Sequence, residues 1–93
     1  SYDAFCNQYV NEAMKIASLA MKKINDPDGK GKENRIHPLV DQDYIKAVAV
    51  SYSLDKVYKT YDVNHSSGAS IRTYFNTIIR NCIINKRKKR MHI

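Results

Sequence analysis

The chain has 93 residues, of which 43% are hydrophobic, so it is expected to form one small globular domain and not a disordered chain. No apolar run approaches the roughly 20 residues of a membrane span, and two distant cysteines, Cys6 and Cys82, fit a reduced cytosolic protein better than a disulfide scaffold. The net charge is +7: residues 1–65 contain nine basic and nine acidic residues, whereas residues 66–93 contain seven basic residues and no acid. This asymmetry favours a polyanionic partner, nucleic acid first and a membrane surface second.

The first helix is predicted over residues 2–24. Apolar side chains recur there every three or four positions, which places them on one helical face, and these are Phe5, Tyr9, Ala13, Ile16, Ala17, Ala20 and Ile24. The Asn-, Asp-, Pro- and Gly-rich stretch that follows predicts a loop over residues 25–37.

The second helix is predicted over residues 38–61. Pro38 suits a first helical turn, and Asp41 and Asp43 suit the positive end of the helix dipole. Two apolar stripes interleave along this segment, so it is expected to be the central helix, packed from two sides. Its tyrosines, Tyr52, Tyr58 and Tyr61, fall at core-facing spacings, as does Tyr74 farther along. Core packing is their favoured interpretation, and stacking on unpaired bases is the alternative for a tyrosine that is exposed. Residues 62–69 are predicted to form a loop.

The third helix is predicted over residues 70–88, with Ser70 as its N-cap. Its apolar stripe has the most regular helical spacing in the chain, and consists of Ile71, Tyr74, Phe75, Ile78, Ile79, Cys82 and Ile83. The predicted fold is therefore all-α, a single domain over residues 1–93 with a small bundle of three to four helices.

The polar face of the third helix is the candidate functional surface. Arg72, Asn76 and Arg80 lie one helical turn apart, and the helix continues into a basic run at residues 86–90. Such a row of cations and amides fits contact with phosphates. The alternative interpretation of the basic run is a solvated tail.

Other kinds of site are not indicated. His37, His65 and His92 are scattered without metal-ligand spacing, and the glycines form no phosphate-binding loop. Neither paired carboxylates nor a nucleophile with its base is evident. The sequence therefore predicts no cofactor, no metal site and no enzyme.

The end of the second helix, the loop and the third helix together resemble a known family. The pair "YD" at residues 61–62, followed by "GASIRTYFNTIIRNCIINKRKKR" at residues 68–90, resembles the second conserved region of bacterial RNA polymerase sigma factors, most closely the extracytoplasmic-function type. Ile71 stands where that pattern usually has Phe, and Asn85 where it commonly has Asp.

The resemblance implies a function in transcription initiation. The third helix and the preceding loop would engage the minus-ten promoter element and hold the non-template strand. The residues implied or predicted on the DNA side are Arg72, Tyr74, Asn76, Arg80, Asn81, Lys86, Arg87 and Arg90. The central helix would dock on the clamp helices of the largest polymerase subunit, with contacts expected from Asp43, Lys46, Val50 and Ser53. The resemblance also suggests an anti-sigma protein as a partner. It implies that the chain acts in the bacterial cytoplasm and binds no membrane.

Two other functions remain open from the sequence. One is a generic helical DNA- or RNA-binding regulator that makes no polymerase contact. The other is a protein-interaction module whose basic end contacts an acidic partner or a membrane. A steep salt dependence of binding would separate nucleic-acid binding from the protein-interaction module.

Overall fold

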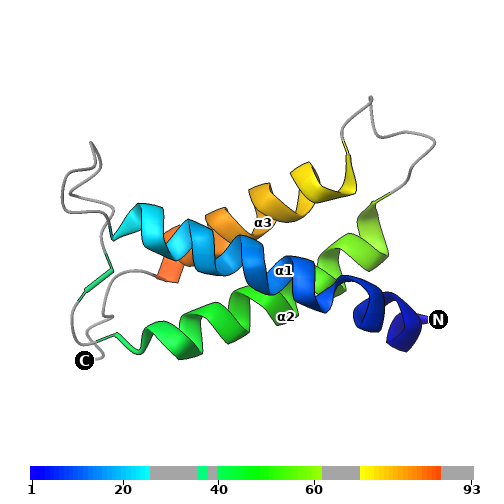
Figure 1. Cartoon of the computed structure of the whole chain (residues 1–93), viewed down its shortest axis with the longest axis horizontal. Helices are drawn as coiled ribbons and strands as arrows, with labels where there is room; N and C mark the ends of the chain where they lie inside the picture. The colour runs from blue at the N-terminus through cyan, green and yellow to red at the C-terminus, as the bar shows by residue number, and fades with distance from the viewer. Residues whose placement is uncertain (26–35, 38–39, 62–69, 87–93) are drawn as a thin grey trace.

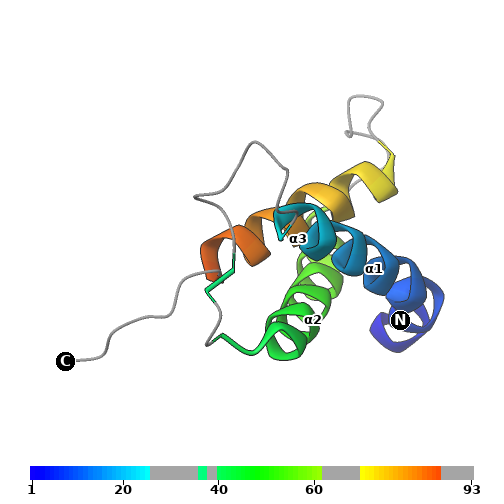
Figure 2. The same cartoon turned by 60° about the vertical axis from the view of Figure 1, so that its left-hand side comes forward.

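The computed structural model describes residues 1–25, 36–37, 40–61 and 70–86. Within these ranges the chain is all-α and has three helices: α1 (Tyr2–Ile24), α2 (Gln42–Thr60) and α3 (Ile71–Lys86). Figure 1 shows α1 and α3 running in one direction and α2 in the other. Every helix packs against the other two, and Figure 2 shows the same three-helix bundle from a second direction.

The predicted apolar stripes meet in one core. Ala13, Ile16, Ala17, Ala20 and Ile24 of α1 are buried, as predicted, and Phe5 and Tyr9 pack against the same core from partly buried positions. In α3 the stripe is likewise confirmed, with five buried members: Phe75, Ile78, Ile79, Cys82 and Ile83. This packing fixes the opposite, polar face of α3 toward solvent.

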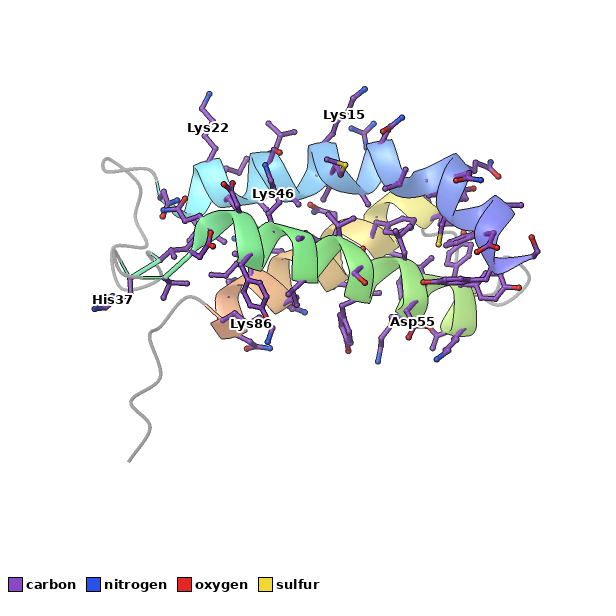
Figure 3. All side chains as sticks on the ribbon, turned by 90° about the horizontal axis from the view of Figure 1, so that it is seen from below. Lys15, Lys22, His37, Lys46, Asp55 and Lys86 are labelled. Carbon is purple, nitrogen blue, oxygen red and sulfur yellow. The ribbon has the colours of Figure 1, made fainter. Side chains whose placement is uncertain are left out.

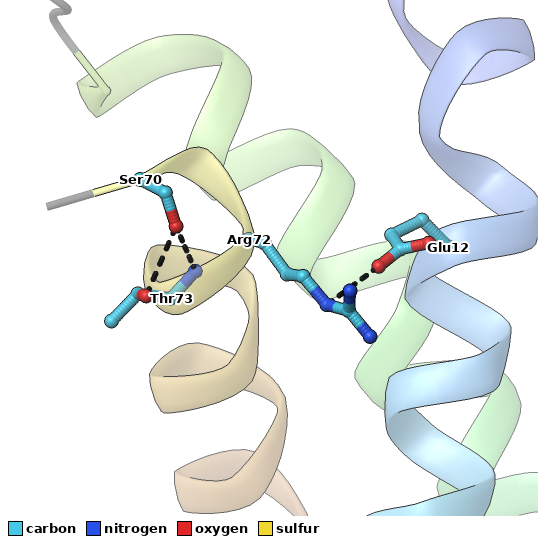
Figure 4. Close-up of polar contacts among 4 residues, drawn as sticks. All are labelled: Glu12, Ser70, Arg72 and Thr73. Atoms are coloured by element: carbon cyan, nitrogen blue, oxygen red, sulfur yellow. Dashed lines mark hydrogen bonds and ion pairs between the residues drawn. The ribbon is translucent and has the colours of Figure 1, made fainter.

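Each helix begins at a side chain that accepts hydrogen bonds from its first turn. The Ser1 hydroxyl accepts from the Ala4 N–H at 3.2 Å, and the predicted N-cap Ser70 accepts from the Thr73 N–H at 3.2 Å (Figure 4). The Asp41 carboxylate accepts from the N–H groups of both Asp43 and Tyr44, at 3.0 and 3.2 Å.

The predicted start of the second helix at residue 38 was wrong. Asp41 has an extended backbone (φ −72°, ψ 106°), and its carboxylate occupies the free N–H groups of the following turn, so α2 begins at Gln42. Its end is also one residue earlier than predicted, because Tyr61 is extended. Four predictions concern positions outside the described residues. They are residues 26–35 of the first predicted loop, the first-turn role of Pro38, the loop at 62–69 and positions 87–88 of the third helix.

Core packing was also the wrong interpretation for two tyrosines of α2. The side chains of Tyr52 and Tyr58 are 48% and 45% exposed. Tyr61 and Tyr74 are partly buried against the core, which agrees with the prediction. The prediction made from the apolar spacing of α2 therefore assigned too wide a face of this helix to the core.

Candidate nucleic-acid interface

The polar face of α3 is exposed over its whole length. Thr73, Asn76, Thr77 and Arg80 are all exposed, and α3 contains no acidic residue. Arg80 forms no ion pair or hydrogen bond with its side chain in the described part of the chain. The face therefore offers a free cation flanked by hydroxyl and amide groups, which are the groups that contact phosphates and sugars.

Arg72 is oriented differently from the other predicted DNA-side residues. Its Nε lies 2.8 Å from a carboxylate oxygen of Glu12, so the guanidinium reaches across to α1 (Figure 4). The Arg72 side chain is 70% exposed. Exposed ion pairs contribute little net stability, so this pairing is weak enough for a phosphate to replace the carboxylate.

Tyr74 is held against the end of α2. Its ring centroid lies 5.5 Å from that of Tyr61, and its hydroxyl is 2.9 Å from the Thr60 hydroxyl. The ring is only partly exposed. Tyr74 therefore serves mainly to join α2 and α3 on the side where the chain enters α3, and it offers little free surface to a base.

A groove with a volume of about 560 Å³ runs between α2 and α3; we call it the α2–α3 groove. Its polar side chains are Tyr52 and Lys56 from α2 and Asn81, Asn85 and Lys86 from α3. No acidic residue lines it, and neither lysine has an ion-pair partner within the described chain. Figure 3 shows Lys86 on the edge of the molecule opposite Lys15 and Lys22 of α1.

The groove has an apolar floor formed by Val48, Ile78 and Cys82. Burial raises the pKa of the Cys82 thiol, and the nearby Lys86 ammonium offsets part of that rise. The thiol is therefore neutral at physiological pH, and the groove has a positive rim over an uncharged floor.

The residues expected to bind polymerase separate into two groups. Asp43, Lys46 and Val50 line a second groove of about 440 Å³ between α1 and α2, in which Val50 is 7% exposed and forms part of the floor. Ser53 is fully buried and donates a hydrogen bond to the Val50 carbonyl oxygen at 2.8 Å. The prediction that Ser53 contacts polymerase directly was therefore wrong, because a fully buried side chain cannot reach a partner unless the core rearranges.

The structure thus joins Asn81 and Lys86 to Lys56, which sequence reasoning missed, and to Tyr52, which it assigned to the core in preference to base stacking. The sequence did contain a sign of this pairing, because Tyr52 and Lys56 are four positions apart and therefore share one face of α2. It was overlooked because Tyr52 also belongs to an apolar stripe, which favoured a core position. Arg87 and Arg90, the remaining predicted DNA-side residues, lie outside the described residues.

No helix in the described ranges is long and apolar enough to cross a membrane. Within the same ranges, no group of three His, Cys, Asp or Glu side chains is placed to hold a metal ion.

No family model matches the chain, and no significant match was found among curated proteins or solved structures.

Proposed function

We propose that this chain is a sigma-type promoter-binding domain that contacts the minus-ten element through α3. The observation that carries the proposal is the exposed, acid-free face of α3, with Arg80 unpaired within the described chain and hydroxyl and amide groups around it. The core packing of α3 holds this face in a fixed orientation, which lowers the entropic cost of binding. The resemblance of residues 61–90 to sigma factors supplies the promoter as the specific ligand.

Polymerase binding would use the groove between α1 and α2. Asp43 and Lys46 stand at its rim and offer one charge of each sign, while Met14 adds an exposed apolar side chain. An apolar floor with a polar rim is the arrangement found in protein interfaces. This groove lies between α1 and α2, so a domain docked there would leave the exposed face of α3 available to DNA.

The DNA half is tested by selecting the preferred sequence from a random pool of single strands about 12 nucleotides long, a length within the usual range for single-strand binding domains. We expect the selected strand to bind more tightly than a scrambled strand of the same composition, with affinity that falls steeply as salt rises. Equal affinity for the two strands would contradict sequence-specific promoter binding.

The polymerase half is tested by capture on an immobilised clamp fragment. We expect capture of the wild-type chain and loss of capture in Asp43→Lys combined with Lys46→Glu, which reverses both rim charges at constant net charge. Lys22→Glu combined with Asp3→Lys is the matched control on α1, outside this groove. A known sigma factor serves as the positive control. If the clamp captures that factor but does not capture this chain, polymerase binding is refuted.

A nucleic-acid-binding regulator without polymerase contact is the second candidate. The burial of Ser53 favours it, because one of the four expected polymerase contacts is then withdrawn from the surface. Specific single-strand binding without clamp capture is the result that would establish this alternative.

A further inference from the structure

The α2–α3 groove differs in chemistry from the face of α3, because it combines an aromatic ring, amides and cations. The chain has nine aromatic residues, and all lie in the described part. Among the described residues, seven of them contact another aromatic ring, whereas Tyr44 and Tyr52 contact none. Tyr52 is the one of these two that lines the α2–α3 groove, and half of its side chain is exposed.

The amides of the groove also have no hydrogen-bond partner among the residues that the structure describes. Asn81 and Asn85 lie one turn apart on α3, and neither side chain forms a hydrogen bond within the described chain. Each amide provides two N–H donors and a carbonyl acceptor. Paired donors and acceptors of this kind match the hydrogen-bonding edge of an unpaired base.

The cations stand on both sides of the groove, with Lys56 on α2 and Lys86 at the end of α3. No acidic residue of the described ranges lines the groove, which favours an anionic occupant. A volume of about 560 Å³ falls within the range of pockets that hold small organic molecules, about 300–1,000 Å³. A nucleotide meets all of these requirements at once.

The geometry points to the α2–α3 groove as the site that receives one unpaired nucleotide of a single strand, with its base stacked on Tyr52. The Asn81 and Asn85 amides face the edge of that base, and Lys56 and Lys86 neutralise the phosphates on either side. This inference rests on the single-strand-binding part of the proposed function and adds α2 to the nucleic-acid surface.

The test measures binding of the selected single strand by fluorescence anisotropy. Base stacking on an aromatic ring predicts that Tyr52→Ala weakens binding by about 5- to 150-fold. Tyr52→Phe keeps the ring and should bind like the wild type. Tyr44→Ala is the matched control, because Tyr44 is an exposed tyrosine of the same helix outside the groove, and it should leave affinity unchanged. Circular dichroism melts establish that all variants are folded.

A double-mutant cycle then locates the base. Abasic sites are placed at successive positions of the strand, and each strand is measured with the wild type and with Tyr52→Ala. At one position the abasic site should weaken wild-type binding strongly and Tyr52→Ala binding little. Two results would overturn the groove inference while leaving the proposed function intact. One is that Tyr52→Ala binds the selected strand as tightly and as specifically as the wild type. The other is that, at every position, the loss of affinity from the abasic site and the loss from Tyr52→Ala simply multiply, so that no position is coupled to Tyr52. Failure of the wild type to bind the selected strand would refute the proposed function itself.

Discussion

At the level of single residues, one side chain of α1 forms an ion pair beside the exposed face of α3. The Glu12 carboxylate lies 2.8 Å from the Arg72 guanidinium and adds a negative charge beside α3, a helix that itself contains no acidic residue. If DNA binds to this face as proposed, this carboxylate would compete with phosphate for Arg72 and would repel the strand.

Glu12→Gln is therefore expected to strengthen DNA binding. The gain should be no more than about fivefold, because interactions between exposed charges are weak. Asp3→Asn is the control: it makes the same charge change on α1, and Asp3 has no ion pair in the described chain. Titration of a labelled strand measures both variants, and equal gains would show that only net charge matters.

Cys82 makes the stability of the domain depend on pH. Burial raises its thiol pKa above the ordinary value of 9.0, so the folded state prefers the neutral thiol. The stabilisation is fully present below pH 9.0 and is lost as the pH rises through the higher pKa of the folded state. Urea unfolding at neutral pH and above pH 9.0 should show this loss in the wild type, and a smaller loss in Cys82→Ala. The same pH dependence in both proteins would exclude the thiol as its cause.

At the scale of the helices, the sequence predicted most of the bundle for clear physical reasons. The three- and four-residue spacing in residues 2–24 and 71–83 identified the buried faces of α1 and α3, because burial follows helical periodicity. The start of α2 was misplaced because Asp41 resembles a first-turn acid, yet acts as the cap. Tyr52 was misassigned because tyrosine suits both a core and an exposed surface.

The Asp41 cap predicts a specific loss of stability. Asp41→Ala should lower the free energy of unfolding by about 1 kcal/mol, since N-cap replacements by Ala typically cost that much. Asp43→Ala removes an acid two residues later, whose side chain accepts no hydrogen bond from the first turn in the described chain. It should cost clearly less. Urea denaturation compares the two, and equal losses would mean that Asp41 acts only through its charge.

At the scale of the whole molecule, the positive charge collects where α3 ends. Lys86 is exposed there, and Arg87 and Arg90, which follow in the sequence, extend the basic run beyond the described residues. The candidate site was predictable in part from this charge distribution. Its α2 half was not, because only packing reveals that Tyr52 and Lys56 face Asn81 and Lys86 across a groove.

Replacing Lys86, Arg87 and Arg90 together by Ala should flatten the salt dependence of single-strand binding. If all three contact phosphates, the negative slope of log affinity against log salt should become shallower by about two units, since each phosphate contact on a single strand contributes about 0.7. The matched control replaces Lys15, Lys22 and Lys23 of α1, which are exposed and make the same change in net charge. Figure 3 shows that Lys15 and Lys22 project from the edge opposite Lys86. A slope that the first triple variant leaves unchanged would identify the basic run as a solvated tail.

We propose above that α3 and the facing side of α2 form one nucleic-acid surface. The most direct test is to map backbone amide chemical shifts by NMR while the selected single strand is added. The largest changes are predicted at Thr73, Asn76, Arg80 and Asn81 of α3 and at Tyr52 and Lys56 of α2, with little change at Lys15 and Lys22 of α1. Changes concentrated on the outer face of α1, or none along α3, would contradict the account.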